Sequence, residues 1–160
     1  MKDLYVFFRD IWVESCGHLS NFSIGRVEIA KNKKVSYIYE PKLKLDYQYD
    51  FGSTTFFEVH FLAEYSIHQK EKIKLLSRNE PLKIICATCK IKPAVTLCSI
   101  CLDNEYAFFC ETCSTKHEKV CEDFVDYSAM PVVNSPRMGV CGYDGGSIDQ
   151  ERDGVYNVVS

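Results

Sequence analysis

Residues 86–121 constrain the fold of this chain more than any other stretch. Their 36 positions hold three Cys-x2-Cys pairs, each eight residues from the next, and then a histidine and a cysteine separated by three residues. Zinc binds thiolates and imidazole in closed tetrahedral sites, with paired ligands commonly two to four residues apart. The spacing therefore predicts two structural zinc ions. The eight predicted ligands are Cys86, Cys89, Cys98, Cys101, Cys110, Cys113, His117 and Cys121.

Disulfide bonds are the alternative use of so many cysteines. Acidic residues and an arginine interrupt the apolar run at the start of the chain, so we expect no secretory signal. No stretch approaches the roughly 18 apolar residues of a membrane span. We therefore expect a cytosolic protein without membrane contact, and in a reducing cytosol such cysteine pairs are typically metal ligands. The odd total of nine cysteines also argues against complete disulfide pairing.

The eight ligands can be divided between two ions in two ways. Sequential pairing would place the first two pairs on one ion and the last two on the other. Cross-brace pairing would join the first pair with the third and the second with the fourth. The late histidine and the even spacing resemble cross-braced modules of the MYND and B-box type, which favours the second scheme.

Metal is expected to fold this segment and not to catalyse a reaction. Chains below about 40 residues usually need metals or disulfides because their apolar core is too small. A catalytic zinc would keep an open position for water, whereas eight ligands close two tetrahedral sites. The chain contains no Gly-rich phosphate loop, no Gly-x-Ser-x-Gly and no His-Glu-x-x-His motif. We predict no catalytic residues.

The segment before the cysteines has the pattern of a helix followed by strands. Apolar residues at helical spacing predict an amphipathic helix over residues 4–12 that ends near Gly17. Alternation predicts a strand over 43–49, a turn at 50–53 in which Gly52 is free to take a positive φ, and a returning strand over 54–65. Extended segments are also expected at 18–30, 35–40 and 72–76. The fold class is α+β, a helix packed on a mostly antiparallel sheet, with a small cross-brace-like two-zinc lobe.

These patterns divide the chain into four parts. We expect an α+β body over residues 1–80, a zinc-binding lobe over 81–125, a strap over 126–145 that packs back on the body, and a flexible tail over 146–160. The strap carries three candidate recognition residues, Asn134, Arg137 and Tyr143. An arginine at such a position suits an anion or a carboxylate.

Charge is unevenly distributed, although the formal net charge is only −3. Between residues 70 and 92, seven basic side chains face two acids, whereas an excess of acids follows from residue 102 onward. The candidate nucleic-acid contacts of this basic neck are Lys70, Lys72, Lys74, Lys90 and Lys92. No aromatic stacking pattern accompanies them, so ordinary solvated faces are the favoured interpretation.

Four stretches carry a resemblance to a known family. They are His18-Leu-Ser-Asn-Phe, Tyr47-Gln-Tyr-Asp-Phe-Gly-Ser-Thr-Thr, Ile73-Lys-Leu-Leu-Ser-Arg-Asn-Glu-Pro, and the stretch from Pro131 that contains Asn134-Ser-Pro-Arg-Met-Gly-Val-Cys-Gly-Tyr. The chain resembles, over roughly residues 4–145, the plasmid pRi open-reading-frame-three-like family, also described as an insertion-element passenger (TnpR-type) domain. The resemblance implies an α+β fold, a link to mobile elements and little about activity.

The resemblance also draws attention to the start of the sheet. Longer members of that family begin with a strand ahead of the helix, whereas this chain opens almost directly on the helix. An unpaired sheet edge is a pairing hazard. We therefore expect another segment or another subunit to cover it, and coverage by a subunit would make the protein an oligomer.

The function favoured by these observations is a non-enzymatic, zinc-stabilised interaction module of a prokaryotic cytosolic protein, with a protein as partner. One alternative is a nucleic-acid-associated factor that uses the basic neck. Another is an enzyme with a site between body and zinc lobe, for which only Arg137, His18 and Asp50 are loose candidates. Cys16 lies two residues from His18, but the sequence shows no third group to orient such a pair.

Overall fold

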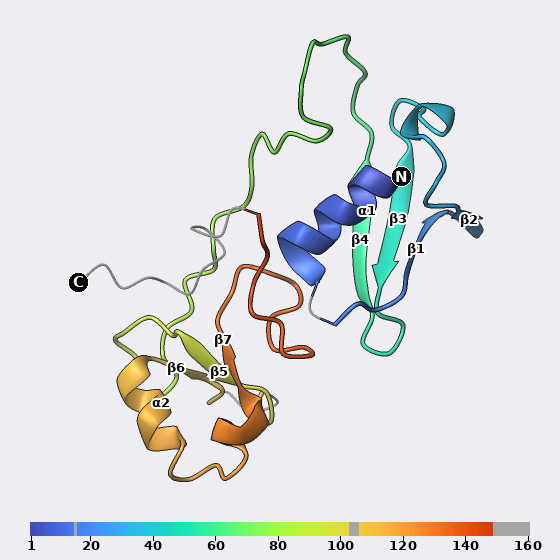
Figure 1. Ribbon diagram of the computed structural model, residues 1–160. Coiled ribbons are helices and arrows are strands. Elements are labelled where there is room, and N and C mark those ends of the chain that lie inside the picture. Colours follow the sequence, from blue (N-terminus) through green and yellow to red (C-terminus); the bar gives the residue numbers. More distant parts are fainter. Residues whose placement is uncertain (15, 103–105, 149–160) are drawn as a thin grey trace. The chain divides into compact units, whose positions relative to one another are not determined.

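The computed structural model describes residues 1–14, 16–102 and 106–148. The chain forms two compact units. The sheet unit comprises Met1–Asp10 and Cys16–Arg78, and the lobe unit comprises Ile11–Ser15 and Asn79–Ser160. Figure 1 shows both, coloured along the sequence.

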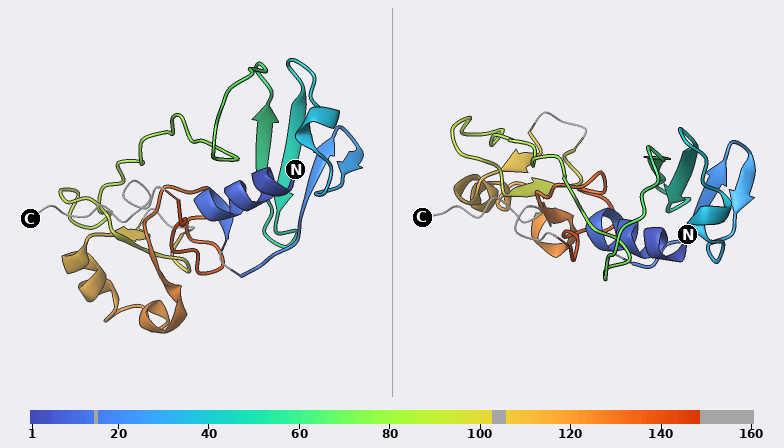
Figure 2. Two further views of the ribbon diagram at one scale, coloured as in Figure 1. Left: turned by 45° about the horizontal axis from the view of Figure 1, so that its top comes forward. Right: turned by 90° about the horizontal axis from the view of Figure 1, so that it is seen from above.

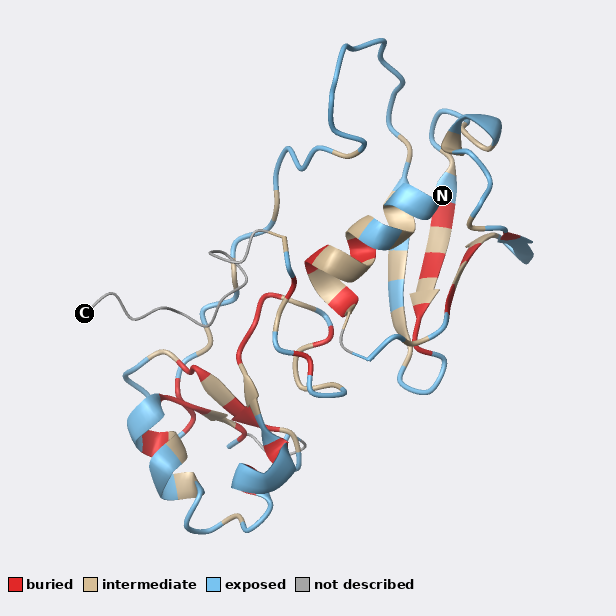
Figure 3. Ribbon diagram, viewed as in Figure 1, coloured by how far each residue is buried: buried red, intermediate tan, exposed pale blue. Residues whose placement is uncertain are grey.

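The sheet unit is a helix on an antiparallel sheet, as its sequence predicts. Helix α1 spans Lys2–Phe8, and the four strands lie in the order β2-β1-β3-β4. Their bounds are β1 Ser20–Ile24, β2 Val27–Ile29, β3 Lys44–Tyr49 and β4 Thr55–His60. Buried and less buried residues alternate along β3, and Figure 3 shows this alternation. The period of two places one side of the strand in a core.

A row of aromatic rings forms that core. Phe22 of β1 lies opposite Tyr47 of β3, which lies opposite Phe57 of β4. Phe8 of α1 covers the row, with its ring centroid 5.2 Å from that of Tyr47 and 5.6 Å from that of Phe57. Figure 2 shows α1 lying along one face of the sheet. Aromatic pairs at such distances contribute beyond the area they bury.

The predicted N-terminal helix changes its winding after two turns. The α-helix ends at Phe8, and a π-helical turn, Arg9–Val13, continues the chain without reaching Gly17. A π turn bonds residue i to i+5, which shifts the helical face. Val13 is therefore fully buried, whereas Trp12, which the helical pattern places in the core, is only half-buried.

The turn between β3 and β4 differs from its prediction in one detail. Asp50 adopts the positive φ of 63°, and Gly52 does not. The Asp50 carboxylate accepts hydrogen bonds from the backbone N–H groups of Gly52 (3.0 Å) and Ser53 (3.3 Å). Aspartate tolerates the left-handed region because its short side chain can bond its own turn in this way.

Two of the predicted extended segments are wrong. Residues 35–40 contain a 3-10 turn, Val35–Tyr37, and residues 72–76 have no regular secondary structure. The strand predicted over 54–65 also ends early, at His60. Alternating apolar residues favour a strand only where a neighbour accepts the backbone hydrogen bonds. Leu76, at 85% exposure, shows that residues 72–76 lie in solvent instead.

The lobe unit contains a smaller sheet and a helix. Three antiparallel strands lie in the order β6-β5-β7, and the helix α2 spans Glu111–His117. The strands are β5 Thr96–Cys98, β6 Phe108–Phe109 and β7 Ala129–Pro131, and a π-helical turn, Phe124–Ser128, precedes β7. Leu97, Ala94 and Val132 form a small apolar cluster on this sheet. With both sheets antiparallel, the predicted α+β fold class is confirmed.

The predicted strap over residues 126–145 contributes to the lobe unit. Its first part forms β7, which pairs with β5. Further on, Gly139 has a φ of 80°, and a Cβ there would lie 2.9 Å from Cδ1 of Leu102. The backbone therefore approaches the lobe as closely as only glycine permits. Packing of the strap on the body stays a prediction, and residues 149–160 of the predicted tail lie outside the described residues.

The aromatic row generates a stability prediction. Replacing the fully buried Phe22 by alanine should lower the free energy of unfolding by about 3–5 kcal/mol, because it opens a cavity in the row. Denaturant titration followed by circular dichroism measures this loss. Phe56 is the matched control, since it is 70% exposed on β4 and Phe56→Ala should change stability by less than about 0.5 kcal/mol. Equal losses in both variants would contradict the described core.

Candidate metal centres

The structure gathers all eight predicted ligands into two groups of four. One group contains Cys86, Cys89, Cys110 and Cys113, and the other contains Cys98, Cys101, His117 and Cys121. Within each group the ligand atoms all lie within 4.8 Å of one another. The first pair thus joins the third and the second joins the fourth, which is the cross-brace arrangement.

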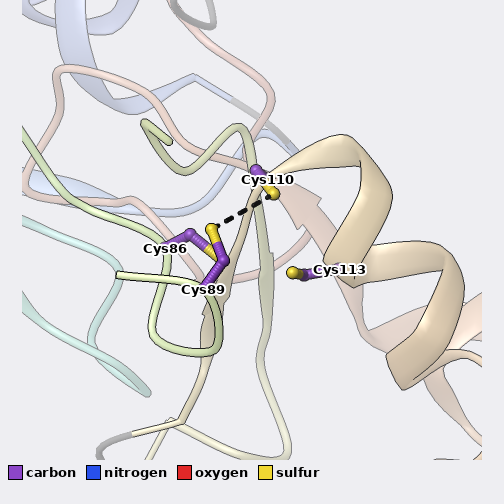
Figure 4. A group of neighbouring side chains, drawn as sticks. All are labelled: Cys86, Cys89, Cys110 and Cys113. Atoms are coloured by element: carbon purple, nitrogen blue, oxygen red, sulfur yellow. Dashed lines mark hydrogen bonds between the residues drawn. The ribbon is translucent and has the colours of Figure 1, made fainter. Parts of the chain in front are cut away.

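The first group joins a loop to the start of α2, and Figure 4 shows its four side chains. An antiparallel bridge between Ile85 and Pro93 closes the loop that carries the first pair. Lys90 in that loop adopts a φ of 58°, so the chain turns back tightly after Cys89. Cys110 caps the N-terminus of α2, and Cys113 lies in its first turn. The Sγ atoms of Cys89 and Cys110 are 3.9 Å apart.

The second group joins the end of β5 to the end of α2. Cys98 is the last residue of β5, and a turn brings the N–H of Cys101 to the Cys98 carbonyl at 3.2 Å. His117 ends α2, and the N–H of Cys121 donates to its carbonyl at 3.0 Å. The Sγ of Cys98 lies 3.9 Å from that of Cys121, and the Sγ of Cys101 lies 3.7 Å from Nε2 of His117.

These distances fit a tetrahedral zinc ion. Zinc–sulfur bonds of about 2.3 Å give sulfur–sulfur edges of about 3.8 Å in a tetrahedron. The measured separation of 3.9 Å in both groups agrees with that edge. It is far longer than the roughly 2.05 Å of a disulfide bond. The donor sets, four sulfurs in one group and three sulfurs with one imidazole in the other, are typical of structural zinc sites.

Two phenylalanines orient the histidine of the second group. The Phe109 ring stacks on the imidazole of His117 at 4.2 Å between centroids, and the Phe124 ring meets it edge-on at 5.0 Å. Both phenylalanines are almost fully buried. The ring can therefore rotate little, which holds Nε2 toward the three sulfurs. Mutation of residues that orient a metal ligand typically lowers metal affinity by about 10- to 100-fold.

Ser128 supports the same group from the π-helical turn. Its hydroxyl donates to the Asp123 carbonyl at 2.8 Å and lies 3.5 Å from the Sγ of Cys98. Sequence reasoning assigned no role to Ser128, Phe109 or Phe124. The sequence offers one signal for the two phenylalanines, which is that each lies close to a ligand. Phe109 directly precedes Cys110, and Phe124 follows Cys121 by three residues.

Burial and hydrogen bonding shift the pKa values of the thiols in opposite directions within each group. Burial is the largest effect on Cys86 and favours the thiol, but backbone N–H donors outweigh it and lower the pKa to about 6. Burial likewise opposes ionisation of Cys98, where hydrogen bonds from Ser128 and His117 lower the pKa to about 6. Burial, followed by the neighbouring sulfurs, raises the pKa of Cys101 to about 11 and that of Cys113 to about 12.

Each group therefore combines one thiol that ionises readily with another that stays protonated beside it. Thiolates in such proximity repel one another, so a divalent cation is what allows all of them to ionise. Metal binding then releases protons and couples to folding. The donor set thus fits zinc on chemical as well as geometric grounds.

The three candidate recognition residues lie inside the lobe unit. Arg137 and Tyr143 are fully buried, and Asn134 is 8% exposed. The Asn134 side chain accepts a hydrogen bond from the Asn79 side-chain amide and donates one to the Asn79 backbone carbonyl. The backbone N–H of Arg137 donates to the Ser135 hydroxyl. In this structure the residues hold the strap in place, and contact with a partner through them stays a prediction.

The five candidate nucleic-acid contacts are exposed and divide between the units. Lys70, Lys72 and Lys74 belong to the sheet unit, where Lys72 forms an ion pair with Asp3 at 3.1 Å. Lys90 and Lys92 belong to the lobe unit, where Lys90 lies over the Tyr106 ring.

Comparisons with protein-family models, with curated proteins and with solved structures find no match to this chain. Within the described residues, no helix is long and apolar enough to cross a bilayer. The proposed function therefore rests on the chemistry of the two groups of four ligands.

The pairing scheme generates a prediction about metal content. In Cys86→Ser/Cys110→Ser, both substitutions fall in one group, so we expect one zinc ion per chain to survive a competing chelator. In Cys86→Ser/Cys98→Ser, each group loses a ligand, so both ions should be stripped under the same conditions. Native mass spectrometry counts the ions, and wild-type protein should retain two.

The same two variants serve as each other's control, because each removes two thiols. Sequential pairing would reverse their results, with the one surviving ion in Cys86→Ser/Cys98→Ser. Wild-type protein without bound zinc would contradict both schemes.

Proposed function

We propose that this protein is a non-enzymatic interaction module whose lobe unit is folded by two structural zinc ions. The observation that carries the proposal is the alternate grouping of the eight ligands into two four-donor sets. Four protein donors complete the tetrahedron of each ion, which leaves no position for a substrate or an activated water. Such centres stabilise a surface and do not perform a reaction.

The lobe needs this metal energy because its apolar core is small. The cluster around the first and second groups consists of cysteines together with Phe109 and Phe124. Structural zinc supplies roughly 10–16 kcal/mol of apparent binding free energy in small domains, and that energy becomes folding energy. The proposal therefore makes zinc the condition for any surface that the lobe presents.

One exposed stretch of the lobe has the composition of a binding surface. Val120, Val125 and Tyr127 are 80%, 62% and 64% exposed and flank the second zinc group in sequence. Exposed acids accompany them, namely Glu118, Glu122, Asp123 and Asp126. Apolar side chains among carboxylates suit a partner segment that is itself apolar and basic. We assign the partner contact to residues 118–127.

The wider biological setting rests on the family resemblance of four stretches of the chain. A prokaryotic origin and an association with mobile elements stay predictions on that ground. The resemblance favours no activity, which is compatible with a binding role.

Site-specific photocrosslinking tests the binding surface. A photoreactive phenylalanine analogue at Val125 should cross-link to a protein partner in cell extract, and mass spectrometry should map the contact to a basic, apolar segment. The yield should fall several-fold as salt rises, because screening weakens the attraction of the carboxylates. Removal of zinc by a chelator should abolish it.

Thr112 provides the matched control position, since it is exposed on α2 within the same lobe. Cross-linking there should be negligible. Equal yields at the two positions, or a yield at Val125 that ignores zinc removal, would reject residues 118–127 as the contact. Retention of two zinc ions with no cross-link would reject the surface while leaving the metal centres standing.

A further inference from the structure

A second constellation of reactive side chains lies in the sheet unit, separate from the eight metal ligands. The Sγ of Cys16 is 2.8 Å from Nε2 of His18, and the same Nε2 is 3.6 Å from Oδ2 of Asp50. Cys16 is exposed, His18 is partly exposed and Asp50 is buried. The turn after β3 thus brings a carboxylate to a thiol–imidazole pair from 34 residues away in the sequence.

The Asp50 carboxylate is held in place as an anion. Its Oδ1 accepts the N–H groups of Gly52 and Ser53, and hydrogen bonds of this kind favour the charged form. The backbone N–H of Asp50 also donates to the Leu19 carbonyl at 2.9 Å, which fixes the residue beside the segment that carries His18. The other oxygen, Oδ2, faces the imidazole.

This carboxylate determines which form of the imidazole is stable. A lone pair on Nε2 would face a negative oxygen, so a hydrogen on Nε2 is favoured. That hydrogen also points toward the Cys16 sulfur, which then accepts a hydrogen bond instead of donating one. A ring N–H that donates to the sulfur assists the thiolate that acts as the nucleophile. Tyr49 also contacts His18. The backbone N–H of His18 donates a hydrogen bond to the Tyr49 hydroxyl at 3.3 Å, and the Tyr49 ring lies edge-on to the imidazole.

We propose that Cys16 is a reactive thiol and a site of reversible modification by small disulfides. The Cys16 thiolate attacks one sulfur of a disulfide R–S–S–R and forms a mixed disulfide with it. The bond between the two sulfurs of the reagent breaks, and one R–S⁻ leaves with the electron pair. His18 and Asp50 are positioning residues, because they act through the thiolate. A small-molecule thiol in excess reverses the reaction.

The test uses the zinc-loaded full chain in a Cys141→Ser background. Cys141 is the other exposed cysteine, so the substitution leaves Cys16 as the exposed thiol to be measured. The probe is the aromatic disulfide 5,5′-dithiobis(2-nitrobenzoate), whose released thiolate is coloured. At pH 7 we expect His18→Gln to slow the reaction about 10-fold and Asp50→Asn to slow it about 3-fold.

Asp50→Asn is a sharp probe because asparagine keeps the Oδ1 acceptor for the turn and removes the charge. The rate should also depend less steeply on pH in the parent protein than in His18→Gln, a difference that altered packing alone would not produce. Retention of two zinc ions and an unchanged circular dichroism spectrum establish that each variant is folded. Equal rates and equal pH profiles in parent and His18→Gln, or a label mapped to a metal-group cysteine, would overturn the proposal.

Discussion

The lobe unit brings four pairs of ligands together with only small apolar clusters beside them. Two of these thiols resist ionisation, because burial and the neighbouring sulfurs raise the pKa values of Cys101 and Cys113. A divalent cation in each group would turn the repulsion between thiolates into attraction, and the two cations together would fix the loop of the first pair, the end of β5 and both ends of α2. The positions of β5 and β6 would follow from this, since β5 carries Cys98 and β6 leads into Cys110.

Different physical interactions stabilise the two units of the chain. In the sheet unit, Phe8, Phe22, Tyr47 and Phe57 stack into a continuous apolar layer, so the hydrophobic effect supplies the stability. In the lobe unit, one of the buried clusters consists of cysteines together with Phe109 and Phe124. Chelators should therefore affect the lobe selectively, whereas agents that weaken apolar burial act on the sheet. A chain of 160 residues thus has two separate routes to loss of structure.

Local signals were sufficient to predict the ligand pairs and the hairpin of β3 and β4, because spacing and alternation act over a few residues. These local signals were insufficient where packing against a distant part of the chain determines the conformation. Residues 72–76 have the composition of a strand but lie in solvent, and the π turn after Phe8 buries Val13 in place of Trp12. Sequence alone favoured the cross-brace without excluding the sequential scheme, since both satisfy the same spacing. The approach of Asp50 to His18 depends on strand pairing and left no local trace.

Helix α2 carries ligands of both groups, with Cys113 in its first turn and His117 at its end. Residues four apart lie on the same side of a helix, so a single rigid rod of about two turns fixes the separation of the two centres. Occupation of either centre orders this rod and so lowers the entropy that the other must overcome on filling. The two ions should consequently be taken up with positive cooperativity, and a half-loaded lobe should be a scarce species at limiting metal.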